Sequence, residues 1–436
     1  METTAGTVNA RIMGSSDHTN ERLAVFILSS THGLQHFLGR VFPPLIPLIA
    51  TDLQLPLWKL GLIVSLLSVA NGLGQSPMGH LSDRFDRRFI LPVGVLITGI
   101  GYFTVYTATV LGEGLPTLTV RDVEWTGTLL LITVGMIISG VGRSATHPTG
   151  YPLLSANVSP DQQGKALGRW GSASKIGDSI GPAFVGIAIL VLAWQDVFAI
   201  IAAVAAVYAG LLFVYMTRSS LETAPAQAQE TTDEGTAEGG YWLPVVLVFL
   251  TMVAAGFASR GIGTYLPTFI TEVYGFSFEV AGITFGAESV ASIYFSAALL
   301  SGGVAILVVG NLADRYDPRD IMIALYLGAT VTLAALAFVP LTPVTLLAVA
   351  VIIGSTLFAV NPARDAIISR VAPEDREGRI FGYFWTGVVL AGSGFPVLIG
   401  YLSDVVGIQQ GFAYLAIGPL VAIVPLFVLK RKRPDG

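Results

Sequence analysis

The chain has 436 residues, of which 53% are hydrophobic and only 12% are charged. Soluble domains carry about 25% charged residues, so this chain lacks the polar surface of a water-exposed globule. The net charge of −5 and the scattering of the basic residues argue against a nucleic-acid partner. Because there is no cysteine, disulfides, thiolate metal sites and cysteine nucleophiles are excluded.

Apolar stretches of about 20 residues or more, bounded by glycine, proline and charge, predict membrane-spanning helices. In chain order they lie at 23–50, 58–80, 89–112, 126–151, 164–192, 197–217, 242–271, 290–309, 321–340, 344–369, 379–403 and 410–429. The predicted fold class is an all-α membrane protein whose twelve transmembrane helices form two pseudo-symmetric six-helix bundles. Residues 277–309 are too long for one untilted span, so their first part is either an outer loop or a re-entrant segment.

A polar, acidic segment at 218–240 separates the sixth span from the seventh. It cannot bury enough apolar surface to fold, which predicts a flexible cytoplasmic linker. We therefore expect an N-terminal bundle at 1–217 and a C-terminal bundle at 241–436. Most Lys and Arg residues gather on the side that holds both termini, so the chain is expected in the cell membrane with both termini cytoplasmic.

The two halves repeat one another in sequence. The loop that starts at Gly79 reads GHLSDRFDR, and the loop that starts at Gly310 reads GNLADRYDPR. Further along, His147-Pro148 recurs as Asn361-Pro362. Parallel six-helix repeats place a substrate site at their interface near the bilayer midplane.

The paired G-x-L-x-D-R-x-D-x-R loops resemble the signature of the major facilitator superfamily of secondary transporters. The resemblance implies alternating access, a small-molecule substrate and no enzymatic activity. It also implies a gating cluster of ion pairs on the cytoplasmic side, made by Asp83, Arg84, Arg87, Asp314 and Arg315. Simple positive-inside anchoring is the alternative for the arginines.

The fifth span carries a glycine-rich series that resembles the antiporter motif of this family, at Gly168, Gly177, Gly181, Pro182 and Gly186. This resemblance favours exchange or export over uptake. Ordinary close packing of helices through small residues is the alternative.

Five cationic residues lie inside predicted spans, where charge is costly and usually faces a wet interior. Arg40, Arg143, Arg260 and Arg364 fall on spans 1, 4, 7 and 10, which the resemblance implies are cavity-lining. Arg364 stands beside Asp365, so a structural ion pair is an alternative to a substrate role. The fifth, Lys175, lies three residues before Asp178 and could neutralise it locally.

Aligning the first and seventh spans superposes Arg40 on Arg260 as a symmetric pair. The planar guanidinium fork suits carboxylate, phosphate or phosphonate, which predicts an anionic substrate. Histidines share helix faces with the arginines, although packing is the favoured role of His32. The predicted substrate-binding residues are Arg40, Arg260, His36, Arg143 and His147.

In span 7, an arginine followed by Leu-Pro-Thr-Phe, together with the His-Pro pair of span 4, resembles exporters of the fosmidomycin-resistance type. Arginines on spans 1 and 7 also resemble organophosphate:phosphate antiporters, more weakly. No phosphate-binding G-x-x-x-x-G-K-[ST] element is present, so a gradient of protons or a counter-anion is the expected energy source. Asp178 and His147 are the predicted proton carriers, with His36 as a third candidate.

The sequence therefore predicts a proton-coupled antiporter or exporter of small organic anions. It is expected to work in the lipid bilayer as a monomer, without cofactor or metal. A polyspecific exporter of cationic or neutral drugs is the main alternative. A membrane-embedded acyl- or phosphotransferase and a non-transporting sensor are further alternatives.

Overall fold

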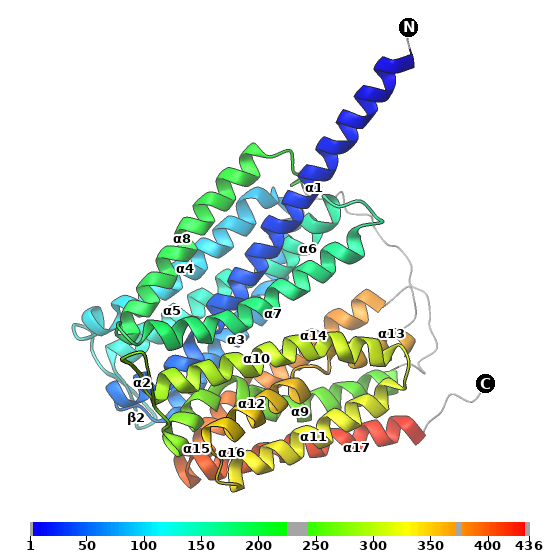
Figure 1. Ribbon diagram of the computed structural model, residues 1–436. Coiled ribbons are helices and arrows are strands. Elements are labelled where there is room, and N and C mark those ends of the chain that lie inside the picture. Colours follow the sequence, from blue (N-terminus) through cyan, green and yellow to red (C-terminus); the bar gives the residue numbers. More distant parts are fainter. Residues whose placement is uncertain (1–2, 225–241, 372–376, 432–436) are drawn as a thin grey trace. The chain divides into compact units, whose positions relative to one another are not determined.

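The computed structural model describes residues 3–224, 242–371 and 377–431 and is mostly helical (Figure 1). The first half contains α1 (Thr3–Gly39), α2 (Phe42–Asp52), α3 (Leu57–Arg84), α4 (Arg87–Gly112), β1 (Leu118–Val120), β2 (Val123–Trp125), α5 (Gly127–Arg143), α6 (Thr146–Ala156), α7 (Gln163–Ala188) and α8 (Trp194–Arg218). Most of the predicted linker, from residue 225 onward, lies outside the described residues.

The second half repeats this series with similar interruptions. It contains α9 (Trp242–Phe269), the π-helix η2 (Ile270–Tyr274), β3 (Phe278–Val280), β4 (Ile283–Phe285), α10 (Ala287–Ala313), α11 (Pro318–Phe338), α12 (Pro343–Leu357), α13 (Asn361–Val371), α14 (Glu377–Ser393), α15 (Phe395–Val406), α16 (Ile408–Leu415) and α17 (Ile417–Arg431). The break between α5 and α6 precedes His147, and the break between α12 and α13 precedes Asn361. The two halves therefore share the positions of their helix breaks as well as their sequence motifs.

Among the described residues, ten helices are long and apolar enough to cross a membrane. The two predicted spans outside this set are the first, formed by α1 and α2, and the fifth, formed by α7. Polar residues lower their hydropathy: His32 and His36 in α1, and Lys175 and Asp178 in α7. The spans that look least like membrane helices are therefore those that carry several predicted site residues.

The long stretch at 277–309 begins with a hairpin. Strands β3 and β4 pair in antiparallel register, with Val280 opposite Ile283, and α10 starts only at Ala287. Ala281 and Gly282 have φ of 52° and 77°, as a two-residue hairpin turn requires. Glu288 accordingly lies in the first turn of α10.

The described chain forms two compact units that do not follow sequence order. Unit 1 contains residues 1–38, 73–177 and 198–229, and unit 2 contains residues 39–72, 178–197 and 230–436. Unit 2 therefore combines the second half with two segments of the first half, one around α2 and one at the end of α7. The expected bundles at 1–217 and 241–436 stay a prediction from the sequence repeat, and the compact units cut across them.

Close helix packing in unit 1 depends on glycines, which have no side chain to hold the backbones apart. A Cβ on Gly142 of α5 would lie 2.6 Å from the carbonyl oxygen of Gly94 on α4, and one on Gly101 would lie 2.5 Å from the Ser139 nitrogen. On α7, a Cβ on Gly177 would overlap the carbonyl oxygen of Gly33 on α1. Backbone contact of this kind is how membrane helices associate without a hydrophobic driving force.

Candidate functional site

Arg40 and Asp178 form an ion pair in unit 2. Arg40 lies just after the last residue of α1, in the turn before α2, and its Nε donates a hydrogen bond of 2.9 Å to Oδ1 of Asp178 on α7. The Asp178 side chain is only 7% exposed, whereas that of Arg40 is 29% exposed. A cation at the C-terminal end of α1 is also favoured by the helix dipole.

Arg260 lies close to this pair in the same unit. The Nη1 atom of Arg40 is 3.5 Å from where a Cβ of Gly263 would stand, so its guanidinium lies against α9 one turn beyond Arg260. The Nε atom of Arg260 is 3.3 Å from where a Cβ of Gly392 on α14 would stand. The two guanidinium groups are near enough to repel each other electrostatically. Within the described part of the chain, Arg260 forms no ion pair.

The charges of this group do not cancel. Arg40 and Arg260 contribute two positive charges, and Asp178 contributes one negative charge when ionised. A net positive, partly buried locus with a half-buried arginine attracts an anion, and the guanidinium fork can bind a carboxylate or phosphate with two hydrogen bonds. The sequence predicted the approach of the two arginines but not that Asp178 would be bound to Arg40.

A second group of predicted residues gathers in unit 1. His32 and His36 of α1 lie beside His147 of α6. The ring centroid of His32 is 4.7 Å from that of His36 and 5.1 Å from that of His147. Arg143 ends α5, one turn before His147, and acts on it electrostatically. The sequence predicted two separate helix faces, and the fold joins them into one cluster.

Arg364 has a structural environment. Its guanidinium donates to Asp365 at 2.9 Å and to Asn361 at 2.9 Å, and it lies 4.3 Å from the ring centre of Trp385. Its side chain is 2% exposed. These contacts favour the structural ion pair over a substrate role.

The two signature loops use their second aspartate in the same way. Asp86 accepts from the backbone N–H and side chain of Arg88 at the start of α4, and Asp317 does so from Arg319 at the start of α11. Hydrogen bonds from Arg319 hold the pKa of Asp317 below its ordinary value. Sequence reasoning missed Arg88, although its place two residues after a helix-capping aspartate was a usable signal.

The predicted gating residues behave differently from one another. Arg87 is buried, and it donates to the Ser82 hydroxyl at 3.1 Å and to the Ala224 carbonyl at 3.2 Å. It therefore ties the segment after α8 to the start of α4. Asp83 and Arg84 are exposed, as are their counterparts in the second loop.

Asp404 of α15 caps the start of α3 within unit 2. Its two carboxylate oxygens accept from the backbone N–H groups of Leu57 and Trp58, each at 2.9 Å. The Tyr265 hydroxyl lies 3.0 Å from the Leu57 carbonyl and 2.8 Å from that of Pro396. These contacts join a helix of the first half to helices of the second half at the end where α2 meets α3.

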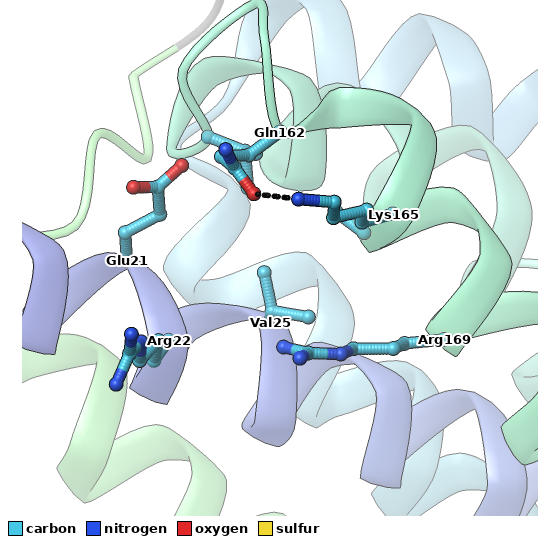
Figure 2. A pocket seen from close by; sticks show the side chains of 8 residues that line it. Glu21, Arg22, Val25, Gln162, Lys165 and Arg169 are labelled. Atoms are coloured by element: carbon cyan, nitrogen blue, oxygen red, sulfur yellow. Dashed lines mark hydrogen bonds between the residues drawn. The ribbon is translucent and has the colours of Figure 1, made fainter.

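A hollow of about 530 Å³ lies between α1 and α7 in unit 1 (Figure 2). Its cations, Arg22, Lys165 and Arg169, are exposed, and Lys165 donates to Gln162 at 3.3 Å. Glu21 of α1 accepts hydrogen bonds from the Ser159 backbone N–H and hydroxyl. Exposed charges of both signs are typical of a membrane–water boundary, and the hollow contains none of the predicted substrate-binding residues, so it is not the predicted site.

Apolar helices in a duplicated series, interrupted spans, and charged groups buried inside spans define a membrane carrier of small molecules. The sequence profile of the Major Facilitator Superfamily matches residues 28–298 and 284–436. The chain therefore belongs to the major facilitator superfamily.

Relatives and solved structures agree with this family. The chain is 29% identical to an MFS-type efflux pump of Mycolicibacterium smegmatis over 63% of each protein. It is 23% identical to the hexuronate transporter of Bacillus subtilis, over 95% of this chain and 96% of that protein. Multidrug resistance protein MdtG of Yersinia enterocolitica is 23% identical, over 86% of this chain and 85% of that protein.

Two transporter structures show the same fold. A bacterial homologue of the human lysosomal transporter Spinster superposes with a TM-score of 0.75 at 14% identity, covering 94% of this chain and 97% of that one. The xylose transporter XylE of Escherichia coli gives a TM-score of 0.72 at 14% identity, covering 95% and 96%. The predicted fold class of two six-helix bundles is confirmed.

Proposed function

We propose that this chain is an antiporter or exporter of small organic anions that works by alternating access in the cell membrane. It draws on protons or a counter-anion, it has no enzymatic activity, and both of its termini are cytoplasmic. The observation that carries this proposal is the approach of Arg40 and Arg260, to which, among the residues that the structure describes, a single acid is bound, Asp178 on Arg40.

The anion competes with Asp178 for Arg40. In the described structure Asp178 occupies one edge of the Arg40 guanidinium, while Arg260 has no acidic partner among the described residues. An anion that binds Arg260 and draws Arg40 away replaces one ion pair with another. The desolvation of Arg40 is thereby offset in both states, and that of Arg260 is offset once the anion is bound.

The competition between the anion and Asp178 for Arg40 determines whether anion binding favours or opposes proton binding. A carboxylate that loses its arginine binds a proton more readily, so anion binding and proton binding at Asp178 favour each other. Proton and anion then travel together through this group. Exchange of one anion for another is the form of antiport that the pair supports, and proton antiport requires a proton carrier other than Asp178.

The test is transport by the purified chain in proteoliposomes. Arg260→Gln and Arg40→Gln should each abolish uptake and exchange of a hexuronate, a phosphonate or phosphate, with the protein still inserted and folded. Arg218→Gln removes an exposed arginine at the end of α8 and serves as the matched control. Full transport by either site variant contradicts the anion proposal.

A second candidate is a polyspecific exporter of cationic or neutral drugs. It is favoured by the relatives named as an efflux pump and a multidrug resistance protein. The excess of positive charge near Arg260 disfavours cationic substrates. A thermal-shift panel of anions and lipophilic cations separates the two, because only the anion transporter is stabilised by anions in a manner that requires Arg260.

A further inference from the structure

Three of the five histidines in the chain meet in unit 1. His32 and His36 are one turn apart on α1, and His147 stands in the first turn of α6. One ring nitrogen from each lies within 4.8 Å of the others. Two histidines four residues apart on one helix, completed by a third from another element, are a known donor arrangement for transition metals.

The surrounding structure orients these rings. His32 Nδ1 lies 2.9 Å from the Trp170 carbonyl oxygen, and the two rings stack at 4.2 Å. A carbonyl can only accept, so Nδ1 carries the proton and Nε2 holds the lone pair of the neutral ring. An imidazole fixed through one nitrogen by a backbone carbonyl is typical of metal-binding histidines.

The ring of His147 is supported as well. It stacks on Tyr151 with 5.6 Å between ring centroids, and the helix break at Ser144 and Ala145 starts a new helix just before it. The His147 ring faces α1, since its centroid lies 5.1 Å from that of His32. Position and ring orientation are thus determined by the backbone and by aromatic contacts.

We infer that His32, His36 and His147 form a binding site for a divalent transition-metal ion of the zinc class. Three imidazole nitrogens suit Zn²⁺ and related ions better than Mg²⁺ or Ca²⁺, which prefer oxygen. Three protein ligands leave a coordination position open. Because Arg143 adds positive charge beside the site, an anionic ligand such as a carboxylate is the group that best fills that position.

The experiment is metal binding by the full chain, purified through an affinity tag without histidine. Co²⁺ serves as the spectroscopic probe and Zn²⁺ as its competitor. We expect one Co²⁺ per chain with the visible absorption of a low-coordinate nitrogen site, and displacement by Zn²⁺. His36→Gln and His147→Gln should each weaken binding by more than about tenfold.

Matched controls make the result decisive. His80 is exposed on α3, so His80→Gln removes a histidine outside the cluster and should leave the affinity unchanged. Zn²⁺ should raise the thermal unfolding temperature of the wild type and of His80→Gln, but not of His36→Gln. Binding that survives in both cluster variants, or absence of stoichiometric binding, overturns the inference. Neither readout depends on transport, so failure of the metal site and failure of the anion proposal remain distinguishable.

Discussion

Replacing Asp178 with asparagine tests the central ion pair with little change of shape. The amide can still accept a hydrogen bond from Arg40 Nε, which now lies 2.9 Å from the carboxylate oxygen, but it carries no charge. The variant therefore resembles the chain with a proton on Asp178. We expect it to bind small organic anions more tightly than the wild type does.

The magnitude follows from the charges. An anion on the opposite edge of the Arg40 guanidinium would lie about 6 Å from the Asp178 carboxylate, where two like charges repel by about 3 kcal/mol at an effective dielectric constant of about 20. The Arg40 side chain is 29% exposed, and solvent screening reduces this value. We expect a gain of about 1.4 kcal/mol, which is about tenfold in affinity.

The assay is anion binding by calorimetry from pH 6 to pH 8, followed by transport in proteoliposomes. In Asp178→Asn, binding should be tighter and no longer accompanied by proton uptake, and exchange of anions should persist without an effect of the pH gradient. Asp196→Asn removes an exposed acid in the first turn of α8 and is the control. Unchanged or weaker anion binding by folded Asp178→Asn would refute the reasoning.

Three further perturbations have defined outcomes. Asp404→Ala removes both hydrogen-bond acceptors at the start of α3 and should lower the stability of this helix end by about 1 kcal/mol. A cysteine that replaces the buried Ser65 of α3 should therefore react with maleimide about fivefold faster in Asp404→Ala than in the chain that keeps Asp404. Gly177→Ala places a Cβ against the α1 backbone and should lower stability in a detergent unfolding assay by about 1–3 kcal/mol. Asp317 stabilises the fold in its ionised form, because its pKa is held low by hydrogen bonds from Arg319. That contribution is complete above the ordinary aspartate pKa and is lost as the pH falls through the lowered value, so wild type and Asp317→Asn should differ in stability at pH 7 and converge in acid.

Each of these has its own control. Unaltered maleimide reactivity of the cysteine at position 65 after loss of Asp404 would show that the cap does not stabilise the start of α3. Gly171→Ala meets no atom within 4 Å and should be neutral or slightly stabilising, so equal losses at both glycines would contradict the close-packing argument. A stability difference for Asp317→Asn that persists unchanged in strong acid would contradict the assigned pKa direction.

Several features could be predicted because they depend on local sequence. Span positions follow from hydropathy, and the duplicated loops place Asp86 and Asp317 at equivalent helix starts, where both act as caps. The face shared by His32 and His36 follows from helical periodicity. Local neutralisation of Asp178 by Lys175 stays a prediction, but sequence spacing gave no sign that Asp178 would also bind Arg40, which is 138 residues distant.

The sequence by itself determined the membrane class, the positions of the spans, the repeat and the residue types available for binding an anion, because hydropathy and helical period are properties of neighbouring residues. Only the tertiary structure decided which charges meet. Arg40, in the turn after α1, meets Asp178 of α7 and lies against α9, and His147 of α6 meets His32 of α1. Contacts of this kind depend on how closely helix backbones approach, and that is set by packing across hundreds of residues rather than by any local pattern.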